Sequence, residues 1–354
     1  MSRFFSKKYE KLRPYVPGEQ PRDRRYIKLN TNESPFPPSP LAQKYAAEEA
    51  GKLELYSDPT CTALTEKACA LLGVEKDEII FTNGSDDALN FAFMAFCDAE
   101  TPAIFPDITY GFYKVFGDLG SIPYREIPLK EDFTIDIADY CKDCGTVFIA
   151  NPNAPTGLTL TLDQIETILK CNPNHVVVID EAYIDFGGET AVPLIRRYEN
   201  LLVIQTFSKS RSMAGGRLGF AIGCKSLIAD LNALKFSTNP FNVNRMTMGA
   251  GIGSLEDTEY FRSCVDRVIR CREWTRQELD KLGMTTIDSS TNFVFTKSDR
   301  VSGKALYAGL RERGILIRHF DTPRLTDYIR VTIGDEEQMA TFIAAMKEIL
   351  EVTQ

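Results

Sequence analysis

Short apolar runs alternate with helical patterns over much of the first two thirds of the chain. The apolar runs are IIFT at Ile79, PAIF at Pro102, TVFIA at Thr146, HVVVID at His175 and LLVIQT at Leu201. Helical patterns lie between them, including one from Ser85 and one from Thr161, where Thr161 and Gln164 match a capping box. This alternation predicts a mostly parallel sheet with helices on both faces, an α/β fold.

The pattern changes after a predicted helix over about residues 255–283. NFVFTK at Asn292, ILIRHF at Ile315 and YIRVTIG at Tyr328 are typical of strands, with a helix near 303–313 and another at the C-terminus. These elements predict a second, smaller α+β unit.

We therefore predict three parts. Residues 1–48 form an N-terminal arm and linker, part of which packs on the small domain, residues 49–255 form a large domain, and residues 256–354 form a small C-terminal domain. The proline cluster SPFPPSP over residues 34–40 marks the linker. Because a segment this short builds no core alone, we expect the arm to lie over the active site or a partner subunit.

Composition restricts the classes of function. Hydrophobic residues make up 44% and charged residues 25% of the 354 residues, which is ordinary for a folded globular protein. No apolar run approaches the roughly 18 residues of a membrane span, and the N-terminus lacks an apolar signal segment, so we expect a cytoplasmic protein. The formal net charge of −8 disfavours nucleic-acid binding through a broad positive field and favours small-molecule chemistry.

The nine cysteines do not suggest a disulfide framework in a chain of this size. Cys141 and Cys144 form one CxxC pair, and the only histidines are His175 and His319. No second pair lies at zinc-binding spacing, so we expect no metal. A turn between two elements is the simpler interpretation of the pair, with a redox role as the alternative.

Polar residues follow several of the predicted strands, where ligands of open α/β sheets bind. Gly84, Ser85 and Asp86 begin a helix, whose free N–H groups suit an anion, although a simple turn and cap gives the same pattern. Asp180 ends a strand that is otherwise apolar, so its charge needs a cationic partner unless it only caps the next element. Lys209 follows the next strand, with Arg217 eight residues later.

The cluster around Lys209 combines hydroxyls, a lysine and an arginine, which together could hold a phosphate and a carbonyl. A surface lysine is the alternative. In order, NPNAPTG from Asn151, DEAY from Asp180 and TFSKS from Thr206 resemble the aspartate-aminotransferase superfamily of pyridoxal 5′-phosphate (PLP) enzymes, fold type I.

More narrowly, four further segments resemble the histidinol-phosphate aminotransferase family. They are LRPYVPGE at Leu12, KLNTNESPFPPSP at Lys28, LYSDP at Leu55 and YIRVTIG at Tyr328. The resemblance runs from about Leu12 to the final helix. It implies a large domain with a mostly parallel seven-stranded sheet and a smaller α+β C-terminal domain.

The resemblance also implies roles around the cofactor. Lys209 would bind PLP covalently and then move a proton between the substrate Cα and the cofactor C4′. Asp180 would pair with the pyridine nitrogen, and Tyr183 would hydrogen-bond the ring hydroxyl. Tyr110 would stack on the ring, unless it is ordinary core packing.

The cofactor phosphate would bind at the helix start, and the neighbouring subunit would contribute Tyr56. The implied phosphate ligands are Gly84, Ser85, Asp86, Thr206, Ser208 and Arg217. A homodimer with a shared active site follows from this role of Tyr56.

One position departs from the superfamily pattern. An asparagine that contacts the ring hydroxyl usually stands directly before PTG, whereas this chain has Ala154 there. Asn153 or a water could replace that contact, or Tyr183 could serve alone.

For the substrate, Arg330 resembles the arginine that receives the anionic end. Arg318 and Tyr15 resemble the groups that hold the phosphate of histidinol phosphate, and Asn32 lies near the site in this family. Two arginines suit a dianionic phosphate, because the guanidinium fork matches its oxygens, although Arg318 could instead form a surface ion pair.

The resemblance implies reversible amino-group transfer between L-histidinol phosphate and 2-oxoglutarate, a step of histidine biosynthesis, by a ping-pong cycle through pyridoxamine phosphate. An aromatic amino acid aminotransferase on the same scaffold is the main alternative, because an anion clamp beside an apolar pocket also fits phenylalanine or tyrosine. A phospho-amino-acid decarboxylase is a further alternative. A PLP-binding DNA regulator is expected least, because the proline-rich arm does not resemble a helix-turn-helix unit.

Overall fold

The computed structural model describes residues 2–10 and 12–352. Residues 1 and 11 of the predicted arm and residues 353–354 of the predicted small domain lie outside it. None of the helices in this described part is long and apolar enough to cross a membrane.

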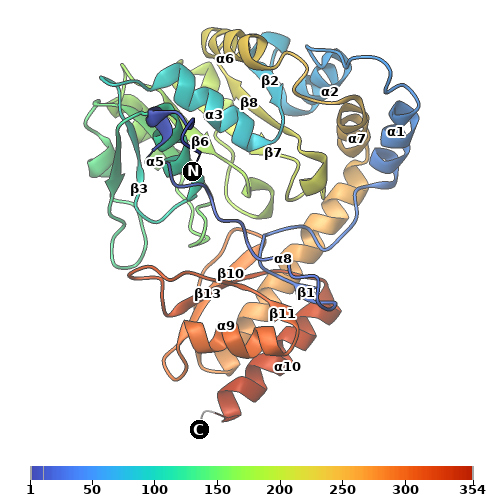
Figure 1. Cartoon of the computed structure of the whole chain (residues 1–354), viewed down its shortest axis with the longest axis vertical. Coiled ribbons are helices and arrows are strands. Elements are labelled where there is room, and N and C mark those ends of the chain that lie inside the picture. The colour runs from blue at the N-terminus through green and yellow to red at the C-terminus, as the bar shows by residue number, and fades with distance from the viewer. Residues whose placement is uncertain (1, 11, 353–354) are drawn as a thin grey trace.

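A seven-stranded sheet forms the centre of the larger part of the molecule (Figure 1). Its strands, in spatial order, are β2 (Ile79–Thr82), β8 (Gly219–Gly223), β7 (Leu201–Thr206), β6 (Val177–Asp180), β5 (Thr146–Ala150), β3 (Ala103–Pro106) and β4 (Tyr124–Ile127). Only β8 runs antiparallel to its neighbours. The central strands are buried along nearly their whole length, as expected for parallel strands covered on both faces.

Helices cover both faces of this sheet. The apolar cluster on one face includes residues of α3 (Ser85–Phe96), α4 (Phe112–Gly120) and α6 (Lys225–Thr238). The cluster on the other face includes residues of α2 (Thr62–Leu72), α5 (Leu162–Cys171) and α7 (Arg245–Glu256). The predicted capping box at Thr161 is present and begins α5. The predicted fold class is therefore confirmed.

The C-terminal part has its own sheet and its own apolar cluster. The sheet order is β12 (Arg318–His319), β13 (Tyr328–Thr332), β10 (Phe293–Ser298) and β9 (Met284–Ile287), all antiparallel. The helices are α8 (Thr258–Lys281), which extends from the larger part down to this sheet, α9 (Gly303–Glu312) and α10 (Glu336–Val352) (Figure 1). Short 3-10 helices span Lys7–Tyr9, Lys76–Glu78, Ile137–Tyr140, Ile184–Phe186, Val192–Arg196 and Ala214–Gly216.

The arm contacts both parts of the chain. Strand β1 (Ile27–Lys28) pairs in parallel with β11 (Ile315–Leu316), so this part of the arm packs on the C-terminal part. Helix α1 (Pro40–Ala50) then packs along α7. Ser39 caps α1 and Pro40 occupies its first turn, so the proline cluster ends by starting a helix. The domain boundary predicted at residue 48 thus falls inside a helix.

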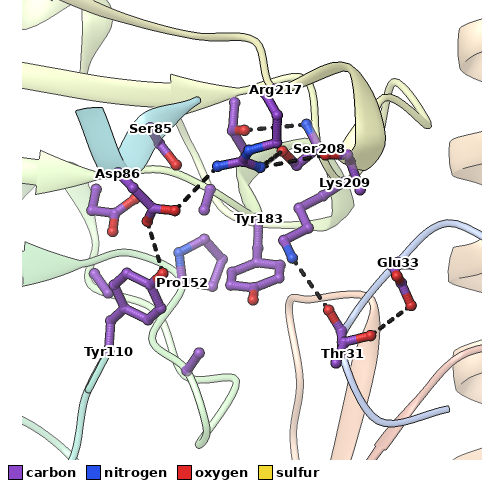
Figure 2. Close-up of a pocket in the computed structure, with 16 residues that line it drawn as sticks. Thr31, Glu33, Ser85, Asp86, Tyr110, Pro152, Tyr183, Ser208, Lys209 and Arg217 are labelled. Atoms are coloured by element: carbon purple, nitrogen blue, oxygen red, sulfur yellow. Dashed lines mark hydrogen bonds and ion pairs between the residues drawn. The ribbon is translucent and has the colours of Figure 1, made fainter. Parts of the chain in front are cut away.

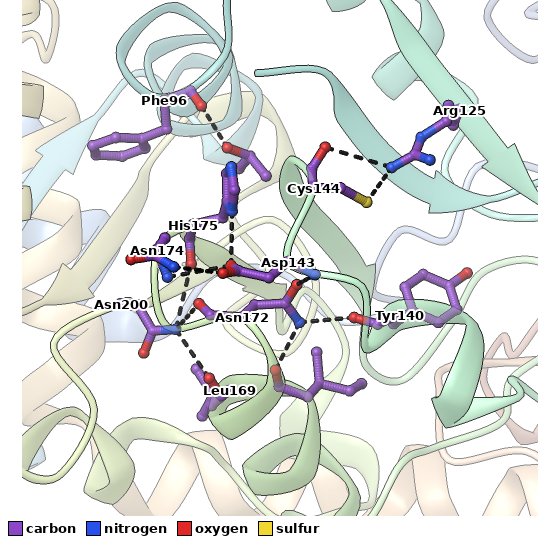
Figure 3. A network of polar contacts seen from close by, with 12 residues as sticks. Phe96, Arg125, Tyr140, Asp143, Cys144, Leu169, Asn172, Asn174, His175 and Asn200 are labelled. Atoms are coloured by element: carbon purple, nitrogen blue, oxygen red, sulfur yellow. Dashed lines mark hydrogen bonds and ion pairs between the residues drawn. The ribbon is translucent and has the colours of Figure 1, made fainter. Parts of the chain in front are cut away.

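A polar network ties together the loops at the sheet edge where β5, β6 and β7 begin (Figure 3). Asp143 accepts hydrogen bonds from the Asn174 side chain at 2.6 Å and pairs with His175 Nδ1 at 2.8 Å. Asn172 donates to the carbonyl oxygens of Tyr140 and Ile168. These side-chain contacts join the loops to one another.

The predicted CxxC pair lies in the same region, between the 3-10 helix at Ile137–Tyr140 and β5. Arg125 contacts the Cys144 thiol (Figure 3). Burial and a hydrogen bond with Cys171 raise the pKa of the Cys141 thiol to about 11. Within the described residues, no group of three or more His, Cys, Asp or Glu side chains is placed to hold a metal ion.

Candidate active site

A cavity of about 230 Å³ opens at the carboxyl ends of the central strands (Figure 2). The structure brings together nine of the predicted cofactor residues around it: Ser85, Asp86, Tyr110, Asp180, Tyr183, Thr206, Ser208, Lys209 and Arg217. They come from five separate segments of the chain. Their convergence follows from the topology, because parallel strands end at the same edge of a sheet.

Asp180 is the last residue of β6 and is 5% exposed. Its Oδ2 accepts a hydrogen bond from the Tyr113 hydroxyl at 2.9 Å. Its Oδ1 is buried without a hydrogen-bond partner among the described residues. Burial raises the pKa of the Asp180 carboxyl to about 6. A carboxylate in this environment is stabilised by a cation placed in the cavity.

Lys209 enters the cavity from the loop after β7 (Figure 2). Its Nζ lies 3.5 Å from the carbonyl oxygen of Thr31, in the arm, and 5.7 Å from the centre of the Tyr183 ring. The amine is thus held over an aromatic face and close to the N-terminal segment.

Arg217 and the start of α3 form a cationic corner of the cavity. Arg217 Nη2 lies 3.2 Å from Asp86 Oδ2, and its Nη1 lies 3.5 Å from Ser208 Oγ. Gly84 precedes α3 with a φ of +81°, and a Cβ there would come within 2.5 Å of Arg217 Nη2. Glycine is therefore required at this position, both for its backbone conformation and for the approach of the guanidinium. Free N–H groups of a helix start beside an arginine suit a phosphate.

Tyr110 closes another side of the cavity (Figure 2). Its hydroxyl donates to Asp86 Oδ1 at 2.8 Å. Burial and the nearby Asp86 charge raise the pKa of Tyr110, so this phenol stays protonated at neutral pH. The ring is held edge-on to Tyr113 at a centroid distance of 5.7 Å.

Asn153 does not line this cavity. Its Nδ2 donates to the Ile108 carbonyl and to Thr156 Oγ1, both at 3.0 Å, and its Oδ1 accepts from Thr109 at 2.8 Å. The amide is therefore used within its own loop region, which leaves the methyl group of Ala154 to face the cavity. The expectation that Asn153 replaces the usual asparagine finds no support in this geometry.

A second cavity of about 370 Å³ adjoins the first and shares Tyr110, Tyr183 and Lys209 with it. The four predicted substrate residues line it: Tyr15, Asn32, Arg318 and Arg330. Tyr15 packs on Phe112 with ring centroids 4.9 Å apart. The arm thus lies over the candidate active site, which is one of the two placements predicted for it.

Arg330 is the most confined cation of the second cavity. Its Nη2 donates to the Asn30 carbonyl at 3.2 Å, while its Nε has no partner in the described part of the chain. Burial lowers the pKa of this guanidinium. Both Arg330 and Arg318 lie over the Phe320 ring, at 5.7 and 5.6 Å. Two cations with incomplete hydrogen bonding face one space, which suits an anionic ligand.

Tyr56 lies outside both cavities of its own chain. Its side chain is 81% exposed and stacks on Phe241 at a centroid distance of 4.6 Å. The structure of one chain therefore does not bring it to the site.

Sequence reasoning missed Tyr113, Thr31 and the contact between Asn32 and Tyr183. Tyr113 is fully buried one helical turn after Tyr110, and only that spacing could have indicated it. Asn32 Nδ2 donates to the Tyr183 hydroxyl at 2.9 Å, a contact across 151 positions that no local pattern predicts.

Comparison with known proteins agrees with this fold. Residues 24–346 match the family described as aminotransferase class I and II. Together, the sheet topology and the cavity with its lysine, aspartate and arginine define a member of this class.

Curated relatives of this chain identify one family within the aminotransferase class. The chain is 47% identical over 353 residues to the histidinol-phosphate aminotransferase of Brachyspira hyodysenteriae, covering 99% of this chain and 100% of that protein. It is 46% identical over 353 residues to that of Clostridium botulinum, with 99% of each chain covered. The chain belongs to the histidinol-phosphate aminotransferase family.

Solved structures of similar proteins share the fold. The histidinol-phosphate aminotransferase of Clostridium acetobutylicum has a TM-score of 0.85 at 25% identity, covering 92% of this chain and 99% of that one. The Sinorhizobium meliloti protein of the same name, in complex with pyridoxal-5′-phosphate, has a TM-score of 0.90 at 22% identity, with 100% and 99% covered.

Proposed function

We propose that this protein is a PLP-dependent transaminase that exchanges the amino group between L-histidinol phosphate and 2-oxoglutarate in two half-reactions. The observation that carries the proposal is Asp180 Oδ1, which has no hydrogen-bond partner among the described residues; Asp180 lines the same cavity as Lys209. Family membership at 47% identity supports the same reaction.

The residues around the cavity fit PLP at both of its ends. Asp180 Oδ1, which has no hydrogen-bond partner among the described residues, would pair with a protonated pyridine nitrogen. The start of α3, Ser208 and Arg217 supply the donors for a phosphate, and Gly84 leaves room for the arginine. When bound, PLP provides an electron-accepting ring that stabilises negative charge at the substrate Cα.

Three side chains of this protein then act near the reacting atoms. Asp180 would keep a proton on the ring nitrogen of bound PLP, because the buried carboxylate is more stable beside a cation. With PLP bound, Lys209 Nζ would accept the proton from the substrate Cα and deliver it to the cofactor C4′. Tyr183 lines both cavities and would therefore lie between the cofactor and the substrate.

The second cavity supports an anionic substrate. Arg330 and Arg318 face it with guanidinium groups, and Tyr15 adds a hydroxyl from the arm. A phosphate monoester carries up to two negative charges. Two arginines therefore suit a phosphate better than they suit a single carboxylate. A dicarboxylic keto acid can use the same two cations in the second half-reaction.

The test is an absorbance spectrum of the PLP-loaded protein before and after L-histidinol phosphate is added without a keto acid. We expect the cofactor absorbance to shift and to return when 2-oxoglutarate is added. Lys209→Ala should abolish the shift, whereas Lys225→Ala, which changes an exposed lysine paired with Asp77, should keep it. No spectral change in the PLP-loaded wild-type protein would refute the substrate assignment.

The aromatic aminotransferase alternative is not favoured by the comparisons, whose curated relatives carry the histidinol-phosphate name. A shift with phenylalanine or tyrosine but not with L-histidinol phosphate would reverse this preference. A decarboxylase would release carbon dioxide and need no keto acid.

We also propose a homodimer with shared active sites, located in the cytoplasm. The exposed Leu53, Leu55 and Tyr56 form one apolar segment, and Tyr56 stacks on the exposed Phe241. Such a patch supports burial against a second copy of the chain.

Mixing subunits tests this arrangement. If Tyr56 serves the neighbouring subunit, inactive Lys209→Ala chains mixed with impaired Tyr56→Ala chains regain activity, because one site of each mixed dimer is intact. No regain in dimers shown to be mixed would contradict the shared site.

A further inference from the structure

We propose that Asn32 is a positioning residue that holds the Tyr183 hydroxyl as a hydrogen-bond donor toward the cofactor ring. This inference rests on the proposed function and assigns Asn32 a different role from direct substrate binding. It explains how the site works without an amide at position 154.

Asn32 is held rigidly by the C-terminal part of the chain. The side chain is buried, with 2% exposure, and the backbone has a φ of +55°, a conformation that asparagine tolerates better than most residues. Its backbone N–H donates to Thr332 Oγ1 at 2.9 Å, and its carbonyl accepts from Asn292 Nδ2 at 3.0 Å. Residues on β13 and just before β10 therefore fix its position.

The same contacts set the direction of the side-chain amide. Thr332 Oγ1 already accepts the Asn32 N–H, and its own proton is donated to Asn32 Oδ1 at 3.1 Å. The amide oxygen is thereby occupied, and Nδ2 points to the Tyr183 hydroxyl at 2.9 Å. Tyr183 therefore accepts a hydrogen bond from Asn32 and keeps its own proton.

That proton has no acceptor among the described residues. Tyr183 lines the cavity that the proposed cofactor occupies, and the neighbouring wall at Ala154 offers only a methyl group. A hydroxyl that accepts one hydrogen bond becomes a better donor in the next one. The geometry thus directs the Tyr183 proton into the cavity, where the ring oxygen of PLP is the chemically suitable acceptor.

The test compares Asn32→Asp, Asn32→Leu, Thr332→Val and Tyr183→Phe in the PLP-loaded protein. The readouts are the pH midpoint of the absorbance change of the bound cofactor, the PLP dissociation constant and the melting temperature. Donation to the ring oxygen stabilises its anionic form, so Tyr183→Phe should raise the pH midpoint by about one unit.

Asn32→Asp preserves shape but offers only acceptors, so Tyr183 should donate to it and the midpoint should rise at least as far as in Tyr183→Phe. Asn32→Leu should raise the midpoint by less, and its effect should vanish when it is combined with Tyr183→Phe. Thr332→Val, which frees the amide to rotate, should act in the same direction. Asn172→Leu removes an equally buried amide at the opposite sheet edge and should lower only the melting temperature.

Unchanged midpoints in Asn32→Asp and Thr332→Val, beside a shifted midpoint in Tyr183→Phe, would overturn the role of Asn32 and leave the proposed function intact. An Asn32→Leu effect that adds fully to that of Tyr183→Phe would also overturn it. A wild-type protein that binds no PLP would instead refute the proposed function. If Asn32→Leu fails to fold, the pH midpoints of Asn32→Asp and Thr332→Val decide whether Asn32 positions Tyr183.

Discussion

Tyr113 gives the most direct test of how this fold controls the charge of Asp180. Its ring is fully buried against Phe93, Phe105 and Phe148, and its hydroxyl donates to Asp180 Oδ2 at 2.9 Å. Tyr113→Phe keeps the ring and its packing and removes only that hydrogen bond. The perturbation therefore acts on the carboxylate and leaves the core in place.

The expected size follows from the contact. A hydrogen bond to a charged group contributes about 1.5–3 kcal/mol, and one pKa unit corresponds to about 1.4 kcal/mol. The pKa of Asp180, which burial raises to about 6, should therefore rise by roughly one to two further units in the protein without cofactor. If ionised Asp180 is the form that binds PLP, the dissociation constant at pH 7 should increase about two- to tenfold.

The assay is a PLP titration of the cofactor-free protein at several pH values between 6 and 9. The difference between variant and wild type should shrink toward pH 9, because Asp180 is then ionised in both. Tyr140→Phe is the matched control, since Tyr140 is also buried but its hydroxyl has no partner among the described residues. A Tyr113→Phe protein with the wild-type dissociation constant at pH 7 would refute this reasoning.

The same shift has a signature in stability. A carboxyl whose folded-state pKa lies above its unfolded value of 3.8 holds more protons in the folded state between about pH 4 and 6. The contribution of Asp180 to the stability of the cofactor-free protein therefore falls as pH rises through that window. Tyr113→Phe should extend the fall to higher pH, which thermal melts across the range would show.

Three other predictions address separate groups. Burial raises the pKa of Glu181 to about 7, so the stability contributed by its neutral form is lost as pH rises from about 4.5 to 7. Glu181→Gln should therefore reduce the fall of the melting temperature with pH in the PLP-loaded protein. An equal fall in the variant and the wild type would count against this prediction. The hydrogen bond with His175 lowers the pKa of Asp143 below its ordinary value of 3.8, so Asp143→Asn should cost about 1 kcal/mol in urea unfolding at pH 7. This cost should decrease as the pH falls below that ordinary value, and a cost independent of pH would contradict the pairing. Arg318→Ala should raise the KM for L-histidinol phosphate about tenfold and the KM for phenylalanine much less. Arg313→Ala, which changes an arginine paired with Glu348, is the control. Equal increases for both substrates would exclude a phosphate clamp.

The sequence was sufficient to predict the fold class and most of the groups around the first cavity. Asp180 and Lys209 each follow a buried apolar run, and parallel order brings such ends to one edge of the sheet. The start of α3 lies at that edge as well, because β2 and β8 complete the sheet beside β7. Local sequence patterns could therefore identify these polar groups, and the predicted strand order was enough to place them at one edge of the sheet.

The side-chain directions could not be predicted in the same way. Asn153 and Ala154 are adjacent, yet the amide of Asn153 turns to Ile108 and Thr156 while Ala154 faces the cavity. Which neighbour faces inward depends in part on the Ile108 carbonyl, 45 positions away in the sequence. The helix that starts at Pro40 was missed for a related reason, since the proline cluster is typical of a linker until Ser39 is seen to cap it.

The segment over residues 27–33 couples the two sheets at the reacting centre. The carbonyl of Leu29 accepts a hydrogen bond from the Thr332 N–H at 2.9 Å, and β1 pairs with β11, so this segment moves with the C-terminal part. Two residues later it meets the large sheet, where the Thr31 carbonyl lies near Lys209 and Asn32 holds Tyr183. A displacement of one part against the other therefore has to stretch these contacts first. The position of the C-terminal part and the placement of Lys209 and Tyr183 are therefore linked through residues 27–33.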